Sequence, residues 1–308
     1  MLNWLQLFRI PTVFTAMADV LCGYFLAATY DSAAGPDVLV LACLLFSSAG
    51  LYLGGMVLND VFDAKLDAVE RPERPVPSGR ISLSSAAFVG TMLILAGLLA
   101  SVSAWLAAGR EGQSLNVACL IAAAVLLYDA VLKSTWAGPV SMAGCRFLNL
   151  SLGASTVVSD VGTATAWELP VLGVSTGLAV YIIGVTWFAR NEAGNASRFG
   201  LIAGLIVAAA GVCLSAAAIL PTQQDATTAW VALLQFTIIV GVTVARGVSA
   251  IRDGQSSVLQ RTVGRMLLWI IVLDAVVVFA STGSVLLEVI ILLLVIPAVV
   301  LRRWIPMS

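Results

Sequence analysis

Ten stretches of the sequence are apolar over about the 20 residues that a helix needs to cross the hydrocarbon core of a membrane. The expected spans are residues 12–30, 38–58, 83–107, 115–132, 138–158, 169–189, 199–220, 228–248, 264–281 and 285–302. A backbone exposed to lipid must satisfy its hydrogen bonds internally, so a chain with this pattern folds as a helical bundle. We therefore predict an all-α polytopic membrane protein of about nine to ten transmembrane helices.

The positive charges support this count independently. Of the 16 Lys and Arg residues, 14 fall in alternate connecting segments, which is typical of cytoplasmic loops. Arg110 lies in one of the other loops, and Arg146 lies within a span. An even number of spans then places both termini in the cytoplasm. We expect a multi-pass protein, in the inner membrane if the source is bacterial, with the polar site loops facing the cytoplasm.

Composition excludes several classes of protein. About 60% of the residues are hydrophobic and 11% are charged, against about 45–50% and 25% in soluble domains. The 16 basic residues nearly balance 17 acidic ones, so the basic face of a nucleic-acid-binding protein is missing. The chain contains no histidine, which excludes catalytic histidine relays and most zinc sites.

The strongest polar motif follows the second span and contains Asn59, Asp60, Asp63 and Asp67. On a helix, Asn59, Asp63 and Asp67 fall on one face at i, i+4 and i+8. Like charges at this spacing destabilise a helix, which suggests that cations bind there. Oxygen-only ligands favour Mg²⁺, which commonly completes its coordination with phosphate oxygens. We predict Asp60, Asp63 and Asp67 as metal ligands, with Asp60 and Asp63 also catalytic. The alternative is a solvated turn at the membrane edge.

The segment that follows, residues 70–80, is rich in proline and arginine. The prolines end the helix and shape a loop. Such a loop can bring Arg71, Arg74 and Arg80 back over the carboxylates, and arginine is suited to bidentate contact with phosphate. The whole segment therefore predicts a site for Mg²⁺ and a diphosphate, with Asn59, Arg71 and Arg74 among the diphosphate ligands.

The pattern Asn59-Asp60-x-x-Asp63-x-x-x-Asp67, followed by Arg-Pro pairs, resembles the first aspartate motif of the UbiA superfamily of intramembrane prenyltransferases. Three shorter patterns add to this resemblance: Arg9-x-Pro11, Tyr128-x-x-x-Leu132-Lys133 and Gly144-x-Arg146-x-x-Asn149-x-x-x-Gly153. The resemblance implies a single UbiA-like domain over residues 1–308. It also implies Mg²⁺-dependent transfer of an isoprenyl group from a prenyl diphosphate to a hydrophobic or aromatic acceptor. The family typically has nine membrane helices, one fewer than the count above.

The second aspartate motif of that family is altered in this chain. Its two acidic positions fall on Asn191 and Asn195. Amide oxygens can bind Mg²⁺ but bring no charge, so we expect these amides and Arg198 to contact the diphosphate directly. The segment 189–193 resembles the EboC-type branch of UbiA-like proteins. This departure leaves an alternative function, a non-catalytic UbiA-like protein that binds or helps transport an isoprenoid or another lipid precursor.

Two basic residues near or within the membrane have two interpretations each. Lys133 directly follows the fourth span; it either neutralises a leaving diphosphate as a catalytic and diphosphate-binding residue or simply marks the cytoplasmic side. Arg146 lies about 12 Å into the fifth span by helical rise, where a charge needs a partner or a wet cavity. It is either a catalytic residue that faces a cavity near Asn149 or the structural partner of an intramembrane acid, Asp19 or Asp274.

Overall fold

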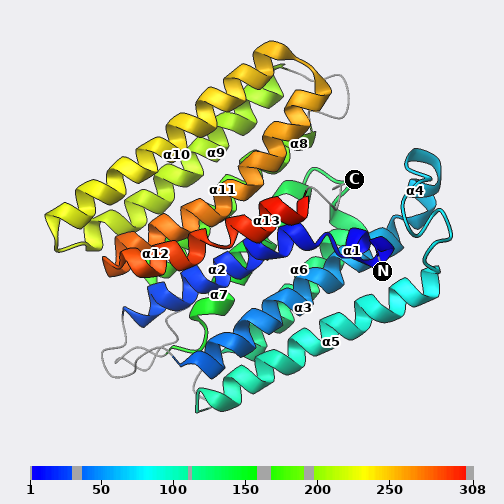
Figure 1. Ribbon diagram of the computed structural model, residues 1–308, viewed down its shortest axis with the longest axis horizontal. Helices are drawn as coiled ribbons and strands as arrows, with labels where there is room; N and C mark the ends of the chain where they lie inside the picture. The colour runs from blue at the N-terminus through cyan, green and yellow to red at the C-terminus, as the bar shows by residue number, and fades with distance from the viewer. Residues whose placement is uncertain (1, 30–36, 110–112, 158–167, 191–197, 303–308) are drawn as a thin grey trace.

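The computed structural model describes the chain except residues 1, 30–36, 110–112, 158–167, 191–197 and 303–308, and its described secondary structure is entirely helical (Figure 1). The helices up to residue 132 are α1 (Leu2–Phe8), η1 (Ile10–Thr12), α2 (Val13–Ala28), α3 (Val38–Phe62), α4 (Ala64–Glu70), α5 (Leu83–Ala107), α6 (Ser114–Leu127) and η2 (Tyr128–Leu132). The remaining helices are α7 (Gly138–Ala154), α8 (Leu169–Arg190), α9 (Arg198–Ile219), η4 (Leu220–Thr222), α10 (Ala226–Asp253), α11 (Ser256–Thr282), α12 (Val285–Leu292) and α13 (Val295–Arg302).

The membrane prediction is confirmed in its class and in the position of its spans. Within the described residues, nine helical segments are long and apolar enough to cross a membrane. The fifth predicted span corresponds to α7, which at 17 residues is shorter than those nine. Even so, α7 packs against both α2 and α8 within the same bundle. All ten predicted stretches are therefore helical, and the chain is a multi-pass integral membrane protein.

The last predicted span is not one continuous helix. Residues 285–302 form α12 and α13, which are separated by Leu293 and Leu294. Pro297 explains the break, because its ring clashes with the carbonyl of the residue four positions earlier and it has no N–H to donate. The boundary before this span is confirmed: α11 ends at Thr282, and Gly283 follows with a φ of 66°.

One end of the bundle gathers the polar connections. Figure 1 shows α1, α4 and the C-terminal end of α13 at the same end of the molecule. The described ends of the chain therefore lie on the same side, as an even number of crossings requires. The cytoplasmic orientation of this end stays a prediction.

Close approach of α2 and α7 brings polar side chains of the two helices together. A Cβ atom on Gly23 of α2 would overlap the carbonyl oxygen of Leu150, and one on Gly153 of α7 would overlap the carbonyl oxygen of Val20. Only glycine allows two helix backbones this close. The consequence for the site is that side chains of α7 reach the interior face of α2.

Candidate functional site

A chain of four charged side chains crosses the polar end of the bundle. Arg9 lies 3.0 Å from Asp60 between guanidinium nitrogen and carboxylate oxygen. Arg74 lies 2.7 Å from Asp67 and 3.8 Å from Asp60 in the same measure. The side chains of Asp60, Asp67 and Arg74 are each only 5% exposed. Buried charges of this kind are costly unless paired, so these pairs hold the end of α3, α4 and the following loop together.

The backbone at Arg9 is constrained in a way that aims its side chain. Arg9 has a φ of 48°, the only positive φ of a non-glycine residue in the described part of the chain. It precedes the 3₁₀ turn η1, which contains Pro11. Left-handed backbone is unfavourable for such a residue and persists where the surroundings enforce it, often at functional sites. Sequence reasoning identified Arg9 only as part of a short motif and missed its contact with Asp60.

Lys133 and Asp63 form a second ion pair beside the first group. The ammonium nitrogen lies 2.5 Å from the carboxylate, and the two side chains are 21% and 19% exposed. Lys133 follows η2, a π-helical turn that ends α6. Single π-helical turns are frequent at functional sites because they displace the side chains that follow. Arg190 donates hydrogen bonds to the carbonyls of Lys133 and Thr135 at 2.5 and 2.7 Å and so fixes this turn.

Asp129 is a polar site residue that sequence reasoning underrated. Asn59 donates a hydrogen bond to it at 2.7 Å. Its other carboxylate oxygen is buried without a hydrogen-bond partner in the described structure. Asp129 lies four residues before Lys133, the spacing of an ion pair along a helix, but the lysine pairs with Asp63 instead. The signal was present in the sequence as an acid one turn before the lysine.

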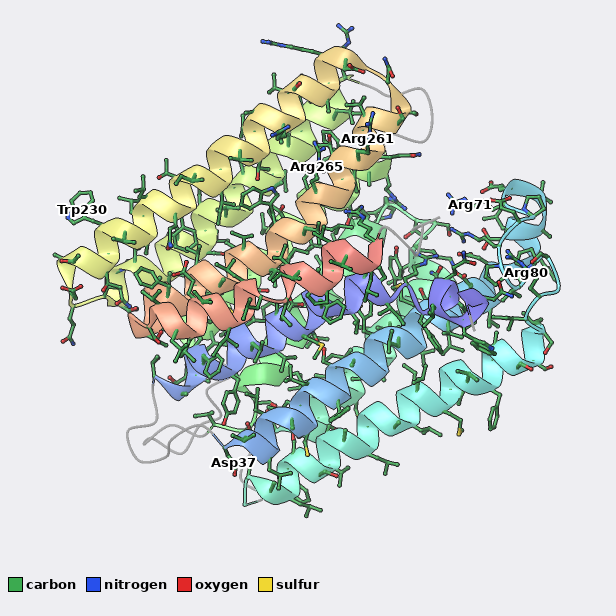
Figure 2. All side chains as sticks on the ribbon, viewed as in Figure 1. Asp37, Arg71, Arg80, Trp230, Arg261 and Arg265 are labelled. Carbon is green, nitrogen blue, oxygen red and sulfur yellow. The ribbon has the colours of Figure 1, made fainter. Side chains whose placement is uncertain are left out.

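The proline-rich loop brings one of its three arginines to the carboxylates, not all three. Arg74 is buried there, as described above. Arg71 is exposed and makes no ion pair within the described residues. Arg80 is also exposed and donates to Ser78 and Asn3. Figure 2 shows Arg71 and Arg80 beside α4 at the polar end. Arg71 and Arg80 thus make no ion pair with the carboxylates in the described residues, and short contacts within the loop and with α1 hold Arg80. The assignment of Arg71 to a diphosphate stays a prediction.

The predicted metal ligands do not converge on one point. No three acidic, histidine or cysteine side chains in the described part of the chain lie close enough together to hold a metal ion. Successive backbone hydrogen bonds link Asn59, Asp63 and Asp67 as expected. However, α3 ends at Phe62, and each carboxylate has a different cation as its nearest partner: Arg9 for Asp60, Lys133 for Asp63 and Arg74 for Asp67.

The donor chemistry nevertheless fits Mg²⁺ that is shared with a ligand. Mg²⁺ commonly takes one or two protein carboxylates and fills its remaining positions with water and phosphate oxygens. Asp63 is the most exposed of the three carboxylates, and Asp129 holds an unpartnered oxygen nearby. Asp67, which is buried against Arg74, suits the positioning of that arginine better than metal binding.

Arg146 forms an ion pair and also lies on a cavity wall, whereas its catalytic role stays a prediction. Its guanidinium donates to Asp19 at 2.8 Å and to Thr15 at 2.6 Å, so it is the structural partner of an intramembrane acid. It also lies over the ring of Tyr52, 5.6 Å from the ring centre. Asn149 donates to the same carboxylate of Asp19 at 2.9 Å. The close packing of α2 and α7 makes these contacts possible.

A small cavity connects this buried cluster to the polar end. It has a volume of about 60 Å³ and is lined by residues of α2, α3, α6, η2 and α7. Arg146 and Asn149 lie on its wall, together with Tyr128 and Asp129. A space this small holds only one or two water molecules. A prenyl chain therefore enters it only if side chains such as Tyr52, Met56 and Met142 move aside.

The altered second motif is only partly described. Asn191 and Asn195 lie outside the described residues. Arg198 is the first residue of α9 and is exposed. There it lines a groove with Arg252 of α10.

Comparison with protein families matches residues 16–193 to the UbiA prenyltransferase family. This range covers more than half of the 308 residues and contains the aspartate motif of α3, Lys133 and Arg146. The chain belongs to the UbiA prenyltransferase family.

Similar curated proteins in this family carry the name digeranylgeranylglyceryl phosphate synthase. The protein from Sulfurisphaera tokodaii is 36% identical over 99 residues, which are 32% of this chain and 34% of the relative. The protein from Methanothrix thermoacetophila is 34% identical over 156 residues, 49% of this chain and 54% of the relative. The aligned part thus spans between a third and about half of the length of these relatives.

Solved structures show the same UbiA fold over nearly the whole chain. A digeranylgeranylglyceryl phosphate synthase structure is 17% identical, with a TM-score of 0.64 over 92% of this chain and 98% of the other. A UbiA homologue from Archaeoglobus fulgidus, bound to GPP and Mg²⁺, is 12% identical, with a TM-score of 0.59 over 90% and 99% of the two chains. At these identities the likeness concerns the fold alone.

Proposed function

We propose that this protein transfers an isoprenyl group from an allylic diphosphate to a hydrophobic acceptor within the membrane. The observation that carries the proposal is the position of Asp60, Asp63 and Lys133 at the polar end of the bundle, next to an internal cavity that reaches Arg146. The diphosphate would lie at the charged end and the prenyl chain in the apolar interior. Membership of the UbiA prenyltransferase family supports the same activity.

In the proposed reaction, the bond between the allylic carbon and the diphosphate oxygen breaks, and the diphosphate leaves with the electron pair. A nucleophilic atom of the acceptor bonds to that carbon and releases a proton to water. Negative charge grows on the leaving oxygens, so preorganised cations there lower the barrier. Lys133 and Arg74 lie among the carboxylates at the polar end of the bundle, and Arg71 is exposed at the same end. We assign Asn191, Asn195 and Arg198 to the diphosphate as well, as the sequence predicts.

Mg²⁺ is the proposed cofactor, with Asp60 and Asp63 as its ligands. Asp67, the third acid of the motif, would support the site through its ion pair with Arg74. When bound, the ion neutralises charge on the diphosphate. A UbiA homologue was solved with both GPP and Mg²⁺ bound, which supports this choice of cofactor. For a metal to reach Asp63, the side chain of Lys133 must give up its ion pair with that carboxylate and turn to the diphosphate. The same lysine therefore has a resting partner in the protein and a proposed partner in the substrate.

For the acceptor, the names of the relatives suggest a specific class. A digeranylgeranylglyceryl phosphate carries two prenyl groups on a glyceryl phosphate. We propose a lipid with a phosphate headgroup as the first acceptor to test, and an aromatic ring precursor as the second. Burial of Arg146 next to Tyr52 gives the interior of the cavity a polar point at which an acceptor headgroup can be oriented.

The test is binding of a non-hydrolysable prenyl diphosphate to the detergent-purified chain, with Mg²⁺ or with EDTA. We expect Mg²⁺-dependent binding that Asp63→Asn weakens at least about tenfold, because the carboxylate loses its charge. Glu70→Gln is the matched control, since Glu70 is an exposed acid at the end of α4. Equal binding by both variants, or binding that ignores EDTA, would contradict the proposal.

A second candidate function follows from the amides of the second motif. Asn191 and Asn195 stand where the family pattern has acids, and the protein would then be an EboC-type UbiA-like chain that binds or helps transport an isoprenoid. The double variant Asn191→Asp/Asn195→Asp separates the two functions. An impaired enzyme gains both metal affinity and turnover, whereas a binding protein gains metal affinity alone.

A further inference from the structure

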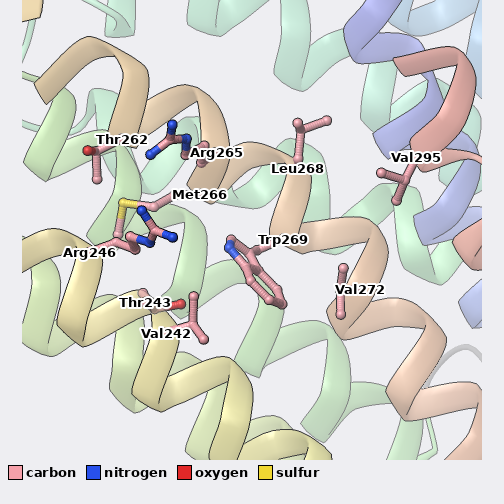
Figure 3. A pocket seen from close by; sticks show the side chains of 10 residues that line it. All are labelled: Val242, Thr243, Arg246, Thr262, Arg265, Met266, Leu268, Trp269, Val272 and Val295. Carbon is pink, nitrogen blue, oxygen red and sulfur yellow. The ribbon is translucent and has the colours of Figure 1, made fainter. Parts of the chain in front are cut away.

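A larger cavity lies away from the candidate functional site, between α10, α11 and α13. Its volume is about 440 Å³, within the range of about 300–1,000 Å³ that is typical of ligand pockets. Arg246 and Arg265 lie at one end of it, and Trp269, Val272 and Val295 line the rest (Figure 3). The cavity therefore has a cationic end and an apolar end.

The two arginines face each other without an acid between them. Figure 3 shows the side chains of Arg246 and Arg265 turned toward the same space from facing helices. Neither forms an ion pair within the described residues, and no acid lines the cavity. Both arginines are exposed, and two cations that face the same space repel each other. An anion between them would turn the repulsion into two charge-assisted hydrogen bonds.

A buried hydroxyl group opens into the same space. Thr243 is 1% exposed, and its oxygen has no hydrogen-bond partner in the described structure. Threonine within a helix commonly bonds a carbonyl of the preceding turn, and a buried hydroxyl group left unpaired is unfavourable. Figure 3 places Thr243 next to Arg246 and the indole ring of Trp269. Polar donors from both helices thus converge on one end of the cavity.

The apolar end extends away from these donors along the membrane-spanning helices. Val272 lies seven residues beyond Arg265 on α11, about 10 Å deeper by helical rise. Leu268 and Trp269 line the cavity between Arg265 and Val272, and Val295 of α13 lines it as well. A ligand that fits has an anionic head and an apolar chain. This polarity matches that of a membrane phospholipid, whose phosphate lies at the surface and whose chains point to the interior.

We propose that this cavity binds an anionic phospholipid, with its phosphate between Arg246 and Arg265 and an acyl chain along Trp269, Val272 and Val295. A zwitterionic lipid fits less well, because its cationic group would face the two arginines. The site is separate from the proposed prenyl-transfer site and does not depend on that function. The lipid would bridge α10 and α11, whose cations otherwise repel each other.

The experiment measures lipid binding to the full chain in neutral detergent by native mass spectrometry. The probes are phosphatidylglycerol and phosphatidylcholine with identical acyl chains. The test variant is Arg246→Gln/Arg265→Gln, and the matched control is Arg252→Gln/Arg261→Gln. The control removes the same charge from exposed positions of the same two helices, outside this cavity. We expect the test variant to bind phosphatidylglycerol about tenfold more weakly and the control to bind it normally.

Three outcomes would overturn the proposal. Equal losses in the test and control variants would show only bulk attraction to the anionic lipid. Equal affinity of the natural chain for both lipids would show an apolar groove without a headgroup site. Displacement of phosphatidylglycerol by millimolar inorganic pyrophosphate would identify a soluble anion as the ligand. Thr243→Val, which keeps both charges, is expected to weaken binding about threefold and tests the site without disturbing the arginines.

Discussion

The polar end of α3 and the cavity between α10 and α11 differ in whether their basic side chains are paired with acids. At the end of α3, Arg9, Arg74 and Lys133 each contact a carboxylate. Between α10 and α11, Arg246 and Arg265 face each other without an acid among the described residues. In the first region each of these cations already has an acidic partner, so an anionic ligand there must displace a carboxylate. In the second region the two arginines have no acidic partner among the described residues, so an anion can bind without displacing one.

This difference predicts opposite signs for the loss of one charge. Removing a cation from a buried pair leaves an acid uncompensated and destabilises the protein. Removing one of two facing cations relieves repulsion and stabilises it. The following three predictions test that contrast, from the largest expected effect to the smallest.

The largest effect is expected at Arg146, a buried arginine of α7 whose carboxylate partner Asp19 is fully buried. Arg146→Met leaves Asp19 without its guanidinium partner, and loss of one member of a buried pair costs about 3–5 kcal/mol. We expect the melting temperature in detergent to fall by about 10 °C, measured by tryptophan fluorescence. Asp19→Asn in the same chain should recover part of the loss. An unchanged melting temperature would show that water already compensates Asp19.

Lys133 is expected to affect turnover more than stability, because its ion pair is partly exposed. Lys133→Met removes the cation that we assign to the leaving diphosphate. Loss of one such group typically lowers kcat about 100-fold or more. The measurement is transfer of a labelled prenyl group at saturating diphosphate, with Lys65→Met as the control, since Lys65 is an exposed lysine of α4. Similar turnover in both variants would assign Lys133 a purely structural role.

The smallest effect, and the one with the opposite sign, is expected at Arg265. Arg265→Gln in lipid-free detergent should raise the melting temperature by about 1 °C, because Arg246 then faces a neutral group. Added phosphatidylglycerol should stabilise the natural chain more than this variant. A lower melting temperature in lipid-free detergent would mean that Arg265 already has an anionic partner, and the contrast between the two regions would fail.

The sequence located the helices better than the contacts between them. Hydrophobic stretches identified every span, and Pro297 accounts for the one break inside a predicted span. The aspartate motif was found from spacing alone, and its three acids do lie at one end of the bundle. The prediction of side-chain contacts failed where several arginines could reach the same carboxylate. Arg74 reaches Asp67, while Arg71, three residues earlier and chemically identical, is exposed.

The sequence by itself determined what is local: the membrane class, the helical segments and the order of the polar motifs. Each follows from periodicity and hydropathy within about 20 residues. Only the tertiary structure decided which residues meet. Asp60 pairs with Arg9 across 51 positions, and Asp19 pairs with Arg146 across 127. Such pairs depend on how closely whole helices pack, here on glycines that let α2 approach α7. That geometry is a property of the assembled bundle, because no single helix contains both partners.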